Sequence, residues 1–155
     1  MTFSKTIAVS VRTLIAITLA SAGISASAGE AVGKIKKLTG TVTIERAGKA
    51  VSAAPGMVVE VKDVIRTSAS SSVGLTTHDN ALVSLGPNSV LTLNQYAFNS
   101  TTHEGKMDAA LSKGSLSMAS GKLTKQSPES VKITTPTAVL AVRGTEFFAE
   151  VEDKK

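Results

Sequence analysis

Apolar and polar residues alternate along short stretches of this chain. Val42 and Ile44 alternate with threonines, and Leu91 and Leu93 flank Thr92 in the same way. A period of two is typical of a β-strand that buries one of its faces. Glycine, proline, asparagine and aspartate separate these stretches at short intervals, as turns do between strands. The pattern therefore predicts a chain of many short β-strands.

The predicted turns contain residues suited to their backbone conformations, because glycine and asparagine readily adopt the positive φ of tight turns. These turns are Pro55-Gly56, Asp79-Asn80 and Gly86-Pro87-Asn88. Only the segment from His103 to Gly114 could form a helical turn, and we expect it to be a loop leading into a strand. The chain is thus predicted to be an all-β single domain, a sandwich or roll of the jelly-roll or double-stranded β-helix-like kind.

The first residues have the three-part layout of a secretory signal peptide. Lys5 and Arg12 precede an apolar stretch from Leu14 to Ile24, and small residues follow up to Ala28. A membrane-spanning helix needs about 20 apolar residues, more than this stretch offers. We therefore expect residues 1–28 to be removed as a signal peptide. Residues 29–155 would remain as one domain, periplasmic or secreted, with no stable membrane anchor.

Composition narrows the function classes. The formal net charge of +5 falls to +3 when the leader takes Lys5 and Arg12 with it, so the mature chain is only mildly basic. Because the chain has no cysteine, disulfides, thiol catalysis and thiolate metal sites are excluded. The chain has no tryptophan and few other aromatic residues, so it is poorly suited to stacking on sugars or nucleic-acid bases. We expect no nucleic-acid partner.

The two histidines do not suggest a catalytic or metal site. His78 and Asp79 are adjacent in a predicted turn, where we expect a solvated hairpin tip and not a catalytic pair. His103, Glu104 and Asp108 match no common metal-ligand spacing. No nucleophile motif occurs in the sequence. We therefore expect a protein that is not an enzyme and that has no cofactor or metal.

The most specific motif is the segment TPTAVLAVRGTEF of residues 135–147. Four earlier segments accompany it: GTVTIER (40–46), KDVIRTSASSSVGL (62–75), ALVSLGPNSVLTL (81–93) and ALSKGSLSM (110–118). With them, the chain resembles the FecR-domain family from about Gly33 to Val151. It departs mildly from the family at Lys62-Asp63, where Gly-Asp is common, and at Asp79-Asn80, where Asp-Gly is usual. The resemblance gives motif or structural roles to Asp63, Thr135, Pro136, Arg143, Gly144, Thr145 and Phe147.

The resemblance implies a periplasmic all-β module for sensing or interaction. In iron-uptake regulation, full-length members pass a signal from an outer-membrane transporter to a cytoplasmic sigma factor. We expect this chain to be a stand-alone exported domain that recognises an envelope protein or ligand without doing chemistry. The alternative is a structural or surface-assembly protein of the cell envelope or matrix. The partner, the stimulus, the oligomeric state and any link to iron uptake stay open.

Arg143 has two interpretations. As a structural clamp, it would donate hydrogen bonds to carbonyl groups or to a carboxylate such as Asp63 or Glu146. The alternative is an arginine that binds a ligand. Phe147 is expected in the core, while Phe148, on the opposite face of the strand, is either covered or part of a contact surface.

Overall fold

The alternating segments form twelve β-strands in the computed structural model, which describes residues 29–152. The strands are β1 (Ala31–Thr39), β2 (Val42–Arg46), β3 (Lys49–Ser52), β4 (Val58–Glu60), β5 (Val64–Thr67), β6 (Ser72–Thr77), β7 (Leu82–Leu85), β8 (Val90–Phe98), β9 (Gly105–Ala119), β10 (Val131–Thr134), β11 (Val139–Ala141) and β12 (Glu146–Val151). A short helix, α1 (Lys122–Gln126), and a 3-10 turn (Pro128–Ser130) lie between β9 and β10. Within the described part of the chain, no helix is long and apolar enough to cross a membrane.

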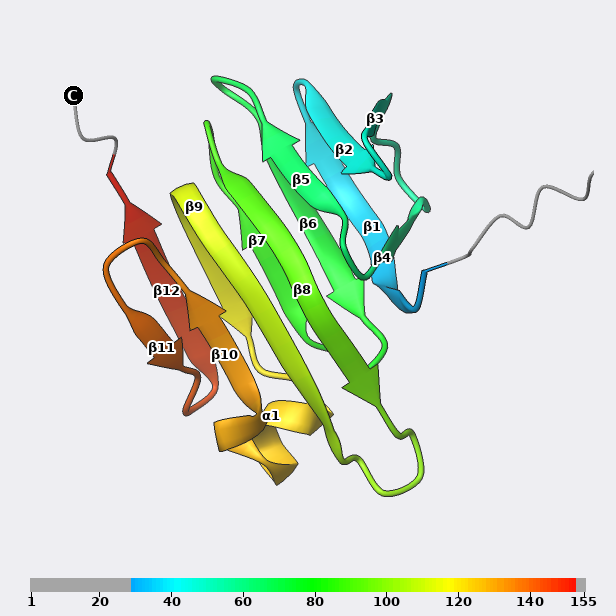
Figure 1. Ribbon diagram of the computed structural model, residues 1–155, viewed down its shortest axis with the longest axis vertical. Helices are drawn as coiled ribbons and strands as arrows, with labels where there is room; N and C mark the ends of the chain where they lie inside the picture. The colour runs from blue at the N-terminus through cyan, green and yellow to red at the C-terminus, as the bar shows by residue number, and fades with distance from the viewer. Residues whose placement is uncertain (1–28, 153–155) are drawn as a thin grey trace, which may run out of the picture.

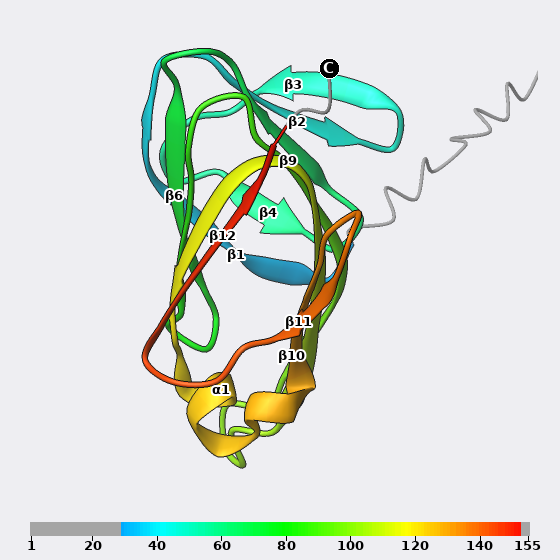
Figure 2. The same cartoon turned by 90° about the vertical axis from the view of Figure 1, so that its left-hand side faces the viewer.

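The strands form one sheet that folds over on itself into two facing layers (Figure 1, Figure 2). Layer A has the strand order β4-β1-β6-β7-β9-β12, and layer B has the order β3-β2-β5-β8-β9-β10-β11. Paired strands are antiparallel except for β9 and β10, which are parallel. The curled sheet has the form of a half-barrel, and the predicted all-β single domain is confirmed.

Strand β9 belongs to both layers. Residues 105–113 pair with β8 and β10, whereas residues 114–119 pair with β7 and β12. The buried positions change parity between the two halves: they are Met107, Ala109 and Leu111, then Leu116 and Met118. A regular strand keeps one parity for each face. The change therefore marks a bend, and Figure 2 shows β9 arching from one layer to the other.

Gly114 lies at this bend with a φ of 81°. A Cβ atom at this position would lie 2.5 Å from the Cα atom of Ser89, closer than side chains tolerate. Ser89 is fully buried, and its hydroxyl accepts a hydrogen bond from the N–H of Ser115 at 3.0 Å. The N–H of Ser89 donates to the hydroxyl of Thr67 at 2.8 Å. Both the backbone conformation and this close approach require glycine at position 114.

The hydrophobic core fills the space between the layers. Its largest fully buried side chains are Ile35, Leu75, Leu85, Leu116 and Met118 on layer A, and Ile44, Ile65, Leu91, Leu93, Met107 and Leu111 on layer B. Burial of each such side chain stabilises the fold by roughly 1.5–3 kcal/mol. Helix α1 lies at one end of the sandwich (Figure 2). Leu123 of α1 is fully buried, as is Val142, whose N–H donates to the carbonyl of Val131 directly after the 3-10 turn.

The expected turns and the expected loop had different outcomes. Gly56, Asn80 and Asn88 have the positive φ expected of them, at 84°, 64° and 51°.

The prediction of a loop from His103 to Gly114 is wrong, because most of this segment is the first half of β9. Its lysine, alanine and glycine residues have weak strand propensity, but pairing with β8 on one edge and β10 on the other overrides that preference.

We expect Gly114→Ala to lower the free energy of unfolding by roughly 2–4 kcal/mol, because it adds a clash with Ser89 to the strain of a positive φ. Gly48→Ala is the matched control: Gly48 has a φ of 75°, but a Cβ there meets nothing within 4 Å. The control should lose only about 1 kcal/mol. Chemical denaturation measures both values, and equal losses would show that the approach to Ser89 has no energetic effect.

Candidate functional site

The motif block of residues 135–147 carries the chain from layer B to layer A. Strands β10 and β11 form a hairpin on layer B, and β12 pairs with β9 on layer A (Figure 1). Thr135 closes the hairpin turn, because its N–H and its hydroxyl donate to the carbonyl oxygen of Ala138 at 2.8 and 3.1 Å. Pro136 lies exposed in the same turn. The Thr-Pro pair thus shapes the start of the crossing.

The second turn of the block presents Arg143 to solvent. Val142 is fully buried, and its N–H donates to the first carbonyl of β10 at 3.1 Å. Ser120 anchors the residues that follow Arg143. Its N–H donates to the carbonyl oxygen of Thr145 at 2.8 Å, and its hydroxyl donates to the carbonyl oxygen of Gly144 at 2.5 Å. Gly144 provides the bend with a φ of 101°. Between these anchored neighbours, Arg143 is exposed and forms no hydrogen bond or ion pair within residues 29–152.

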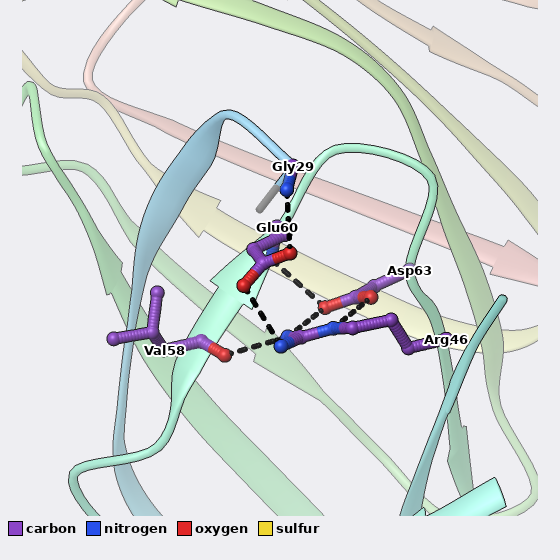
Figure 3. A network of polar contacts seen from close by, with 5 residues as sticks. All are labelled: Gly29, Arg46, Val58, Glu60 and Asp63. Atoms are coloured by element: carbon purple, nitrogen blue, oxygen red, sulfur yellow. Dashed lines mark hydrogen bonds and ion pairs between the residues drawn. The ribbon is translucent and has the colours of Figure 1, made fainter. Parts of the chain in front are cut away.

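The clamp expected from Arg143 is formed by a different arginine. Nε and Nη2 of Arg46 donate to the two carboxylate oxygens of Asp63 at 2.8 and 2.7 Å (Figure 3). The expected pairing of Arg143 with Asp63 is therefore not formed. Glu146, the other proposed acceptor, is exposed and has no ion pair in the described part of the chain. Nothing in the sequence pattern around Arg46 marks it as a structural residue, because its partners lie 12 to 17 positions further along the chain.

Arg46 joins three strands through one guanidinium group. Besides Asp63, it donates to the carboxylate of Glu60 and to the carbonyl of Val58, both at 2.8 Å. The fully buried Asp63 also accepts from the N–H of Glu60 at 2.8 Å (Figure 3). The hydrogen bond to Asp63 is the largest cause that raises the pKa of Arg46. This network is a structural clamp between β2, β4 and the start of β5.

A second buried carboxylate, Asp79, lies in the turn before β7. Its Oδ1 accepts from the hydroxyl of Thr77 at 2.5 Å and from that of Tyr96 at 3.0 Å. Its N–H donates back to the hydroxyl oxygen of Tyr96 at 3.0 Å. Burial is the largest cause that raises the pKa of Tyr96, and the nearby charge of Asp79 adds to it. Asp79 is therefore a structural residue, because its carboxylate and its N–H bond to neighbouring side chains of the fold.

The expected solvated hairpin tip is wrong for Asp79, which is 1% exposed, although His78 and Asn80 are exposed. The cause is α1, which covers the turn from a distant part of the sequence. Oδ2 of Asp79 accepts from the N–H of Leu123 at 3.3 Å. The backbone carbonyl oxygen of Asp79 accepts from the N–H of Lys122 at 2.8 Å. Asp79 therefore joins the β6–β7 turn to the start of the helix.

The aromatic and apolar residues of the motif region lie on different surfaces. Phe147 is partly buried and packs against the core. Phe148 is 65% exposed on the outer face of layer A, and Val139 is 66% exposed on the hairpin of layer B. The two exposed side chains therefore belong to opposite outer faces of the sandwich.

The polar segment between β8 and β9 contains no cluster of metal ligands. The ring of His103 stacks on Phe98, with centroids 6.2 Å apart, and Asp108 accepts from the side-chain amide of Asn94 at 2.9 Å. Glu104 is exposed. Across residues 29–152, no group of three or more histidine, cysteine, aspartate or glutamate residues is placed to hold a metal ion.

Comparison with models of known families gives a match. The model of the family described as FecR protein matches residues 63–155. The match begins at the buried Asp63 and includes Arg143 and the rest of the motif block, whereas β1 to β4 lie before it. It is therefore shorter than the resemblance seen from about Gly33. No curated protein and no solved structure matches the chain.

Arg46→Met should lower the free energy of unfolding by roughly 2–4 kcal/mol, because it leaves the buried carboxylate of Asp63 without its cation. Arg66→Met is the matched control. Arg66 pairs with Glu45 at 3.4 Å, with both side chains largely exposed, and its loss should cost less than about 1 kcal/mol. Thermal and chemical denaturation would compare the two, and similar small losses would contradict the role given to Arg46.

The chain has a single tyrosine, so absorbance at 295 nm reports the ionisation of Tyr96 alone. Because the pKa of Tyr96 is raised in the fold, the unfolded chain releases this proton first, at about pH 10. The free energy of unfolding should therefore fall as pH rises above about 10. Tyrosinate should form only as the β-type circular dichroism is lost. A midpoint near pH 10 in protein that is still folded would refute the buried environment.

Proposed function

Because this chain belongs to the FecR family, we propose that it is a non-enzymatic module that recognises a protein of the cell envelope. FecR domains are sensing and signalling modules of envelope regulation. We further propose that it acts in the periplasm after export. Support for export comes from the leader-like sequence of residues 1–28, which lie outside the described residues.

The exposure of Arg143 carries this proposal. The family motif anchors the residues on both sides of Arg143 and leaves its five N–H donors without a partner in residues 29–152. Arginine on a fixed turn is well suited to bind carboxylate or carbonyl groups of another protein, since its planar guanidinium loses little conformational entropy per hydrogen bond formed.

The hairpin next to this turn adds apolar and basic contacts. Val139 is 66% exposed on β11. On β10, Lys132 is exposed opposite Ala141. Val139 and Lys132 on this hairpin, with Arg143 in the turn that follows it, fit a partner surface that offers both apolar and acidic groups.

The test is site-specific photo-crosslinking in cells that produce the full chain, with a photoreactive phenylalanine derivative at position 139. We expect one crosslinked envelope protein, and no such product from the same probe at Val51, an exposed site on β3. Arg143→Ala should remove the crosslink without changing the melting temperature. Arg66→Met, a change at another exposed arginine, should leave the crosslink intact.

Three outcomes would contradict the proposal. Equal crosslinking from Val139 and Val51 would show that the hairpin has no specific partner. A lower melting temperature for Arg143→Ala would show that Arg143 stabilises the fold. Crosslinks from Val139 that join only copies of this chain would favour the alternative of a surface-assembly protein.

A further inference from the structure

Two rows of side chains cross five strands on the outer face of layer A, and half of these side chains are small. The strand registers align each row from β12 to β1. The first row is Phe148, Ser117, Ser84, Gly74 and Lys37, and the second is Glu146, Ala119, Leu82, Thr76 and Lys34. Their neighbours along each strand point mainly into the core, so both rows lie on the outer face, although the hydroxyl of Thr76 is buried.

Two exposed apolar side chains and a hollow are the main features of this face, and a smaller hollow of about 260 Å³ lies beside Lys34 and Thr76. Phe148 is 65% exposed and Leu82 is 50% exposed. A hollow of about 360 Å³ lies over Gly74, with Lys37 and Ser84 among its lining residues. A Cβ atom on Gly74 would have its nearest neighbour at 3.8 Å, so the space above the backbone is open. The face thus carries a protruding ring at one end and a recess at the other.

We propose that two copies of this protein bind each other through the outer face of layer A. A twofold axis parallel to the strands and between β7 and β9 places Ser84 opposite Ser117 of the second copy. In the first row, the same operation places Phe148 of each copy over Gly74 of the other copy. The interface is therefore isologous, with each ring entering the hollow of the other copy.

The second row fits the same axis. Leu82 comes to lie over Ala119 of the second copy, so a large side chain again meets a small one. Glu146 comes to lie over Thr76 of the second copy, next to Lys34. Two twisted sheets can pack in this way with their strands within about 30° of each other.

The distribution of charge on this face favours a second copy of the protein as its binding partner. Strand β1 carries Lys34, Lys36 and Lys37 at one end, and β12 carries Glu146 and Glu150 at the other. All five are exposed and have no ion pair within residues 29–152. A wholly acidic or wholly basic partner would match one end and be repelled by the other. A second copy related by the twofold axis matches both ends.

The size of the face predicts a weak dimer. The twofold axis superposes four strands of each copy, β12, β9, β7 and β6, which are about 4.8 Å apart and five or six residues long and make a surface of about 19 by 18 Å. Two such surfaces total about 700 Å², which is below the roughly 1,200–2,000 Å² of stable specific interfaces and in the range of weak, transient contacts. We therefore expect a dissociation constant in the micromolar range, with dimers that dissociate on dilution.

Sedimentation equilibrium of the purified protein, made from the full chain, tests the proposal. We expect a monomer–dimer equilibrium. Phe148→Ser and Gly74→Leu should each raise the dissociation constant at least tenfold, by removing the ring and by filling the hollow. Val51→Ser, a change at an exposed apolar residue on β3 of layer B, should leave it unchanged. A monomer at every concentration, or a dimer that Phe148→Ser does not weaken, would overturn the proposal.

Crosslinking tests the position of the axis, because the chain contains no cysteine of its own. A short bismaleimide should join Ser84→Cys to Ser117→Cys when the two variants are mixed. It should not join Ser84→Cys to Val51→Cys. Equal crosslinking of both mixtures would reject this arrangement. Because Val139 lies on the hairpin of layer B and the two sets of experiments change different residues, the failure of one proposal is distinguishable from the failure of the other.

Discussion

The bend in β9 is the constraint on which the rest of the structure depends. Its first half pairs with β8 and β10 and its second half with β7 and β12, so one strand holds both layers. The positive φ of Gly114 and its approach to Ser89 turn the sheet over at this point. Without that turn, the apolar faces of the two layers would not meet, and the core would face water.

Buried polar groups hold the ends of this folded sheet. Arg46 joins Asp63 to β4, and Asp79 joins the β6–β7 turn to Tyr96 and α1. Such groups are costly to bury alone, so each has several partners. Because these carboxylates are used by the scaffold, the groups available for recognition are on the outer faces. Arg143 lies near the hairpin of layer B, and Phe148 lies on layer A.

Local features of the sequence predicted the strands and the turns, because alternation and positive-φ residues act within a few positions. The clamp of Asp63 was not predictable in this way. Arg46 reaches Asp63 because Glu45 pairs with Val64, and that register depends on long-range packing. The burial of Asp79 likewise depends on a helix more than forty residues later. Lys62 stands where the family commonly has glycine. Its φ of 77° is in the left-handed region that glycine favours.

Strand β9 makes the two layers one cooperative unit. Native-state hydrogen exchange tests this cooperativity most directly, because the amides of both halves of β9 can be followed separately. We expect amides in residues 107–111 and 116–118, and those paired with them on β7 and β8, to exchange with one free energy of opening equal to that of global unfolding. A lower free energy for the layer A amides than for the layer B amides would show that the layers open independently, and would contradict the account.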